Sequence, residues 1–184
     1  MYKIKNIAQY FIYEKEEEDP NKIMILCFYS YCWGLALKKD IFKAKFEAWV
    51  HLPTNIELRG ILYEGWDLNY NILDDYNDKL LDSDTINFLN MIWNTYGEYD
   101  RHQLESIVHQ ESPYIKARKG YQLFDACNII IEDEDIIEEF RYRDLRYSFK
   151  LIRNYNDVVE SILKNFKGDE LIKIINKLKK DLTS

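Results

Sequence analysis

The chain has 184 residues, a formal net charge of −7 and an aromatic-rich composition with 15 Tyr, 9 Phe and 4 Trp. The length fits one domain, and the negative charge argues against a surface that binds nucleic-acid phosphates. No apolar run reaches the roughly 18 residues of a membrane-spanning helix, and no signal peptide is evident. Three cysteines without metal-ligand spacing predict buried, reduced thiols in a cytoplasmic protein: Cys27, Cys32 and Cys127.

The N-terminal third predicts two helices. Apolar residues at helical spacing predict a short first helix near residues 4–11. Asp19 followed by Pro20 is typical of a helix start, with Asp as the cap and Pro at the first helical position. Residues 23–37 are apolar on nearly every face, a pattern that indicates a buried helix. We therefore expect this helix, which contains Trp33, to form the centre of the core.

The next segments are shorter. Residues 41–50 contain two apolar stretches with extended character and predict a small β element. Pro53 precedes a helix predicted from about Asn55 to Tyr63. Together with the central helix, these segments indicate a mainly α fold with at most a small β element.

Residues 64–83 are the least helical part of the body. They carry five aspartates, and three aromatic residues are interleaved with them: Trp66, Tyr70 and Tyr76. Aromatic residues set among charges are typical of protein-binding surfaces, so we expect these three to bind a partner. A variable surface loop is the alternative. A calcium-binding loop is not predicted, because Ile72 stands where that loop needs glycine.

Two helix starts follow. Ser83 or Asp84 is expected to cap a helix that ends at Gly97. Asp100 with Gln103 three residues later is typical of a capping box, in which each side chain satisfies the backbone amide of the other. The second helix is expected to reach the region of His109.

A helix–helix corner is predicted after this second helix. Pro113 cannot continue the helix, and Ser112 followed by Pro113 favours a new helix with Ser112 as its N-cap. Gly120 is expected to close that short helix in a left-handed conformation. The corner therefore places His109 and Glu111 at its joint.

The C-terminal part differs in charge from the body. Residues 1–140 carry 14 Lys and Arg against 26 Asp and Glu, whereas 141–184 carry 11 against 6. One short strand is predicted at residues 128–131, and Asp133 is expected to start a helix. The basic segment predicts a helical extension that packs on the body or on a partner, and its Phe166 is a candidate partner-binding residue.

Two runs of the chain resemble the two signatures of the Panacea domain, a phage-associated family also described as SocA/GepA-like. The first run is Glu-Ala-Trp-Val-His-Leu-Pro-Thr at residues 47–54, behind a Tyr-rich helix. The second is Leu-Glu-x-x-x-His-x-Glu-x-Pro-Tyr at residues 104–114. Leu52 stands where the family has Gly, and Tyr114 where it has Trp. The resemblance covers about the first three quarters of the chain.

The resemblance implies a structural role for the motif residues Trp33, Trp49, His51, Pro53, His109, Glu111 and Pro113. It predicts Trp49 as a core anchor. The family glycine suggests a positive φ at the position of Leu52, so either the turn is rebuilt here or the match is shifted by one residue. Panacea-type proteins are antitoxins, so the resemblance predicts a cytoplasmic protein that neutralises a cognate protein toxin by direct binding. A phage-encoded inhibitor of a host defence protein, also acting by direct binding, is the alternative among binding proteins.

A small hydrolase is the alternative from another class. It would use His109 as a base with a carboxylate such as Glu105 to orient it, and Cys32 is a conceivable nucleophile. Nothing in the sequence brings these residues together, and no phosphate-binding, dinucleotide or metal motif is present. We therefore expect no enzyme, no cofactor and no metal. The expected architecture is a single compact helical domain over residues 1–140, followed by the basic extension 141–184.

Overall fold

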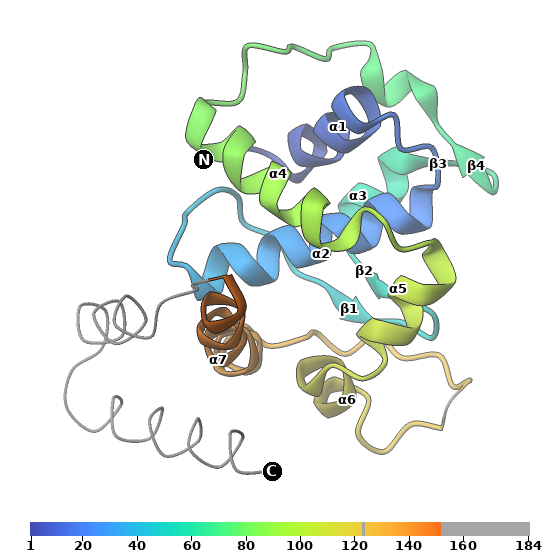
Figure 1. Cartoon of the computed structure of the whole chain (residues 1–184). Helices are drawn as coiled ribbons and strands as arrows, with labels where there is room; N and C mark the ends of the chain where they lie inside the picture. Colours follow the sequence, from blue (N-terminus) through green and yellow to red (C-terminus); the bar gives the residue numbers. More distant parts are fainter. Residues whose placement is uncertain (123, 152–184) are drawn as a thin grey trace. The chain divides into compact units, whose positions relative to one another are not determined.

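The computed structural model describes residues 1–122 and 124–151, which are mainly helical (Figure 1). The chain divides into two compact units, Met1–Glu139 and Phe140–Ser184. The predicted mainly α class is confirmed, because the described residues form seven α-helices, one short 3-10 helix and two sheets of two short strands each. No helix within those residues is long and apolar enough to cross a membrane.

Helices dominate the described chain, and each strand is only two residues long. In chain order the elements are α1 (Ile4–Lys15), α2 (Pro20–Ala36), β1 (Glu47–Ala48), β2 (Pro53–Thr54), α3 (Ile56–Leu62), β3 (Tyr63–Glu64), β4 (Asp67–Leu68), the 3-10 helix η1 (Tyr70–Leu73), α4 (Ser83–Tyr96), α5 (Arg101–Val108), α6 (Ser112–Ala117) and α7 (Asp133–Leu151). The predicted basic extension is described only as far as Leu151, and residues 152–184 lie outside the described residues.

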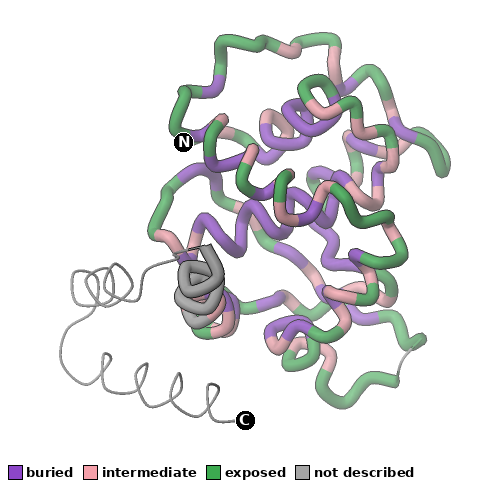
Figure 2. The backbone as a smooth tube through the Cα atoms, in the orientation of Figure 1, coloured by how far each residue is buried: buried purple, intermediate pink, exposed green. Residues whose placement is uncertain are grey.

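Helix α2 forms the centre of the first unit, because its side chains are apolar on all faces. Asp19 caps it by accepting hydrogen bonds from the backbone amides of Asn21 (2.8 Å) and Lys22 (3.3 Å), and Pro20 takes the first helical position. The helix packs on α1, α3, α4, α5 and β2. Figure 2 shows the buried class along nearly its whole length. The prediction of a buried central helix is therefore confirmed.

Aromatic side chains join α2 to its neighbours. The rings of Tyr29 and Tyr96 stack with their centroids 3.9 Å apart, and the Trp33 indole N–H donates to the Tyr96 hydroxyl at 3.0 Å. Phe28 is fully buried and meets the ring of Phe46 edge to face, with centroids 5.2 Å apart. Such ring pairs contribute about 0.5–1.5 kcal/mol beyond the area that they bury.

The first motif run lies on the short antiparallel pair of β1 and β2. The strand predicted at residues 128–131 is not formed. This segment instead makes an isolated bridge between Ile130 and Glu47, flanked by two backbone hydrogen bonds to the β1 region. That prediction is wrong because β1 is only two residues long and offers too few backbone groups for a second full strand.

The turn between β1 and β2 has no strained backbone at Leu52. Among the described residues, a positive φ at a non-glycine position occurs only at Glu16 and Lys38. Leu52 therefore avoids the strain that a positive φ would impose on a leucine. Leu52 is 8% exposed, so its side chain adds buried apolar area at the position where the resembled family has glycine. Its carbonyl accepts a hydrogen bond from the Thr54 hydroxyl at 3.2 Å.

Helix α4 starts from a different cap than the sequence predicts. Asp82, rather than Ser83 or Asp84, is the N-cap and accepts a hydrogen bond from the Thr85 amide at 2.8 Å. The Tyr2 hydroxyl donates to the other Asp82 oxygen, also at 2.8 Å. This second contact spans 80 residues of sequence, so no local pattern indicates it. Both hydrogen bonds favour the ionised carboxylate and lower the pKa of Asp82.

The aromatic core yields a stability prediction. Phe28→Ala and Trp33→Ala should each lower the free energy of unfolding by about 3–5 kcal/mol, because each removes a large buried ring and leaves a cavity. Tyr99→Ala is the matched control, since Tyr99 is 40% exposed and should change stability by no more than about 0.5 kcal/mol. Urea unfolding followed by circular dichroism measures all three. If Phe28→Ala or Trp33→Ala left the free energy of unfolding unchanged, α2 would not be the main source of stability.

Candidate functional site

The second motif run forms a sharp corner between α5 and α6. The predicted capping box is confirmed, since the Asp100 carboxylate accepts from the Gln103 amide at 2.8 Å and the Gln103 side chain accepts from the Asp100 amide at 2.9 Å. His109 is the C-cap residue of α5. Gly120 has the predicted positive φ, +95°, but it lies two residues beyond Arg118, the C-cap of α6.

Glu111 turns into the core at this corner. Ser112 does not cap α6 as predicted. It is the first helical residue, and Glu111 takes the cap position without a side-chain capping bond. Only 1% of Glu111 is exposed, and its Oε1 accepts a hydrogen bond from the Tyr29 hydroxyl at 3.2 Å. Burial, together with this carboxylate, raises the pKa of Tyr29, so the hydroxyl remains a donor. The carboxylate therefore connects the corner to α2.

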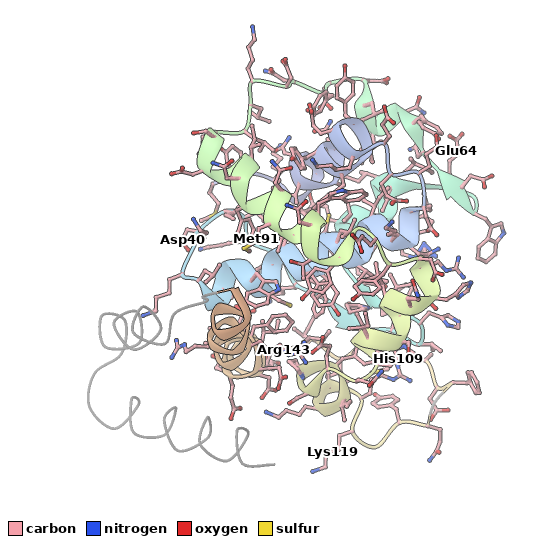
Figure 3. The ribbon with its side chains drawn as sticks, viewed as in Figure 1. Asp40, Glu64, Met91, His109, Lys119 and Arg143 are labelled. Carbon is pink, nitrogen blue, oxygen red and sulfur yellow. The ribbon has the colours of Figure 1, made fainter. Side chains whose placement is uncertain are left out.

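The two motif runs meet in space. His109 Nε2 lies 3.0 Å from the carbonyl oxygen of His51, a hydrogen bond in the tautomer that protonates Nε2. The Tyr114 hydroxyl donates to the carbonyl oxygens of Trp49 and of Val50, the latter at 3.2 Å. The rings of His109 and Tyr114 stack with centroids 5.1 Å apart. Figure 3 shows the labelled His109 at the joint of α5 and α6. The second run thus holds the backbone of the first.

Arg118 adds a third connection that the sequence reading missed. Its guanidinium donates to the carbonyl oxygen of Ala48 at 2.8 Å, and to those of Gln122 at 3.1 Å and Asp125 at 2.9 Å. It thereby ties β1 to the loop after α6. The three acceptors are backbone carbonyls, which every residue carries, so no side-chain pattern in the sequence marks this role.

An open cleft of about 1060 Å³ lies beside the motif contact. Its aromatic walls include Trp49, Tyr63, Trp66 and Phe124. Its charged side chains are Arg59, Arg101 and Glu105. Of the predicted site residues, His51 also lines the cleft. Trp49 is half-buried on the wall of this cleft rather than inside the core, so the prediction of a core anchor is wrong.

Arg59 of α3 lies over two aromatic rings of the cleft. Its guanidinium carbon is 5.3 Å from the ring centroid of Trp49 and 5.1 Å from that of Tyr63. Residues four apart share one face of a helix, which brings Arg59 and Tyr63 together. Asn55 fixes the start of α3, since its side chain accepts from the Leu58 amide at 2.7 Å. The sequence reading missed Arg59, because a single Arg in a short helix has no distinctive pattern.

The other charged groups of the cleft are paired. Arg101 Nε lies 3.0 Å from the Oε1 of Glu105, one helical turn later. The Tyr63 hydroxyl donates to the side-chain oxygen of Asn21 at 3.0 Å. Burial raises the pKa of Tyr63 to about 12 even though the nearby arginines oppose the shift. Tyr63 is therefore a neutral donor at physiological pH.

Trp66 stands at the tip of the hairpin formed by β3 and β4. The loop between these strands is only two residues long, Gly65 and Trp66. Gly65 has a φ of +66°, the conformation that a two-residue hairpin loop requires at its first position. Trp66 is 91% exposed. A tight turn therefore presents a large apolar ring to solvent at the edge of the cleft.

The other predicted partner-binding residues lie in different surroundings. Tyr70, on η1, is 54% exposed. Tyr76 is held against α1, because its ring stacks on Tyr13 with centroids 4.3 Å apart and its hydroxyl donates to Glu14 at 2.7 Å. Phe166 lies outside the described residues. The structure therefore brings Trp66 to the cleft and leaves Tyr70 and Tyr76 on the surface outside it.

The residues of the hydrolase alternative are not assembled as that alternative requires. The Glu105 carboxylate faces Arg101 and approaches Nδ1 of His102 at 3.9 Å, whereas His109 contacts a backbone carbonyl and Tyr114. Cys32 is fully buried. Within residues 1–122 and 124–151, no group of three or more His, Cys, Asp or Glu side chains is placed to hold a metal ion.

Comparison of the chain with protein-family models, curated proteins and solved structures gives no match. Its function is therefore inferred from its own residues and their geometry.

The corner yields a second stability prediction. His109→Ala should lower the free energy of unfolding by about 1–2 kcal/mol, because it removes the contact to the His51 carbonyl and the stacking on Tyr114. Pro113→Ala should lower the free energy of unfolding by about 0.5–1 kcal/mol, because the unfolded chain gains conformational entropy when proline is removed. His102→Ala is the control, because its side chain is 78% exposed. Thermal melts measure all three. If His109→Ala left the melting midpoint unchanged but abolished the function of the protein in cells, His109 would again be a candidate catalytic residue.

Proposed function

We propose that this protein is an antitoxin that neutralises a cognate protein toxin by binding it directly. The observation that carries the proposal is the exposed Trp66, presented on a tight hairpin beside an open aromatic cleft. The resemblance of the two motif runs to the Panacea domain supplies the class of partner. In this proposal the protein acts in the cytoplasm, requires no cofactor and is not an enzyme.

Exposed aromatic rings on rigid elements are suited to protein binding. Burying a Trp ring at an interface removes a large apolar area from water, at about 25 cal/mol per Å². The two-residue loop fixes the backbone of Trp66, so little backbone entropy remains to be lost on binding. Tyr70 lies four residues further along the chain, is 54% exposed, and offers a second ring together with a hydroxyl. Aromatic residues of this kind are enriched among binding hot spots.

The proposal predicts that Trp66 and Tyr70 are needed for neutralisation and not for folding. The double variant Trp66→Ala/Tyr70→Ala should abolish growth rescue when this protein is co-expressed with the toxic product of the gene next to its own. Its melting midpoint should change by no more than the equivalent of about 0.5 kcal/mol, because both side chains are exposed. The affinity of the purified pair should fall in parallel with the loss of growth rescue.

The matched control is Met91→Ala/Tyr99→Ala, which removes two side chains that are each 40% exposed away from the hairpin. Figure 3 shows the labelled Met91 on α4. This variant should rescue growth like the wild-type protein. Full rescue by the Trp66→Ala/Tyr70→Ala variant would contradict the assignment and move the expected interface to the corner near His51 and His109.

A further inference from the structure

We infer that the cleft beside Arg59 binds an acidic side chain, Asp or Glu, on a partner segment where a large apolar residue stands next to it. The inference rests on the proposed function and names the chemistry that the partner presents at the cleft. Three observations carry it: the position of Arg59 over two aromatic rings, the pairing of the other charged residues of the cleft, and the aromatic walls.

The geometry of Arg59 leaves its hydrogen-bond donors available. The guanidinium carbon lies over the rings of Trp49 and Tyr63, 5.3 Å and 5.1 Å from their centroids, so the cation contacts two aromatic rings. The N–H groups of a guanidinium point outward in its own plane, away from such rings. Contacts with two rings restrict the side chain on the wall of the cleft, where a guanidinium offers a planar fork of donors. Carboxylates accept such a fork with two parallel hydrogen bonds.

The charge of Arg59 is not offset within the described part of the chain. Glu105, the acidic residue on the cleft wall, is already engaged by Arg101 at 3.0 Å. No ion pair involving Arg59 is found among residues 1–122 and 124–151. Among the described residues, Arg59 is therefore a cation of the cleft wall without an ion-pair partner.

The single positive charge of Arg59 favours a carboxylate over a phosphate as its ligand. One guanidinium charge matches a single carboxylate, whereas a phosphate carries up to two charges and is usually bound by several cations or a helix N-terminus. The walls contributed by Trp49, Trp66 and Phe124 suit an apolar side chain beside that carboxylate. Phe124 is 79% exposed, so it gains burial when such a residue enters. An acidic residue adjacent to Leu or Phe on a protein surface satisfies both requirements.

The test uses two peptides that differ by one charge, acetyl-Leu-Glu-Phe-amide and acetyl-Leu-Gln-Phe-amide. Each is titrated into the full-length protein while the indole N–H signals of the four tryptophans are followed by NMR. Trp49 and Trp66 line the cleft and report binding there, whereas Trp33 and Trp93 lie outside it and serve as internal references for folding. The Glu peptide should shift the Trp49 and Trp66 signals and bind about tenfold more tightly than the Gln peptide.

Arg59→Gln should remove the preference for the Glu peptide while the Trp33 and Trp93 signals stay in place. Lys119→Gln is the matched control, since it removes the same charge at an exposed position that does not line the cleft (Lys119 is labelled in Figure 3), and it should keep the preference. A second measurement needs no variant: the preference of the wild-type protein for the Glu peptide should shrink as salt is raised.

Three results would overturn the inference. These are equal binding of the two peptides, no shift of Trp49 and Trp66 with either peptide, and an equal shift with inorganic phosphate, which would indicate a general anion site. The outcome is separable from that of the proposed function. Neutralisation of a toxin without a Glu preference would reject the carboxylate site alone, whereas a Glu preference without neutralisation would reject the antitoxin proposal alone.

Discussion

The structure depends on one buried carboxylate, that of Glu111. Placing a carboxylate at 1% exposure is costly unless hydrogen-bond donors reach it. The Tyr29 hydroxyl of α2 is such a donor at 3.2 Å, and Tyr29 is itself fixed by stacking on Tyr96 of α4. This requirement sets where the chain turns between α5 and α6. A Glu111 placed elsewhere would lose its partner, so the corner has little freedom to shift against the core.

The position of the corner in turn determines the cleft. Once Glu111 is held by α2, His109 and Tyr114 on either side of it meet the turn that follows β1. That turn carries Trp49, and Arg59 of α3 lies against the Trp49 ring. A chain of contacts therefore runs from the core to the charged cleft. It consists of hydrogen bonds and ring contacts between residues that are distant in sequence.

The sequence predicted what depends on local chemistry. Asp19 with Pro20 and Asp100 with Gln103 marked helix starts, because caps act within three or four residues. The buried α2 was evident from apolar residues on every face. The sequence did not predict features that depend on distant partners. Asp82 meets Tyr2 across 80 residues, and Glu111 turns inward to Tyr29 rather than leaving the cap to Ser112. In the cleft, Trp66 was predicted as a binding residue from the aromatic and acidic composition of residues 64–83. Arg59 was not predicted, because its contact with the Trp49 ring exists only in the folded chain.

The contacts between the two motif runs use different groups from those that line the cleft. His109, Tyr114 and Arg118 all reach backbone carbonyl oxygens in the segment from Ala48 to His51. A carbonyl is present whatever side chain the residue carries, so these contacts survive changes in the side chains of the turn. The same side chains line the cleft and set its chemistry. Leu52 lies in this turn without a positive φ, so the backbone there requires no glycine. The side chains of this turn can therefore change, and with them the surface of the cleft, at little cost in stability.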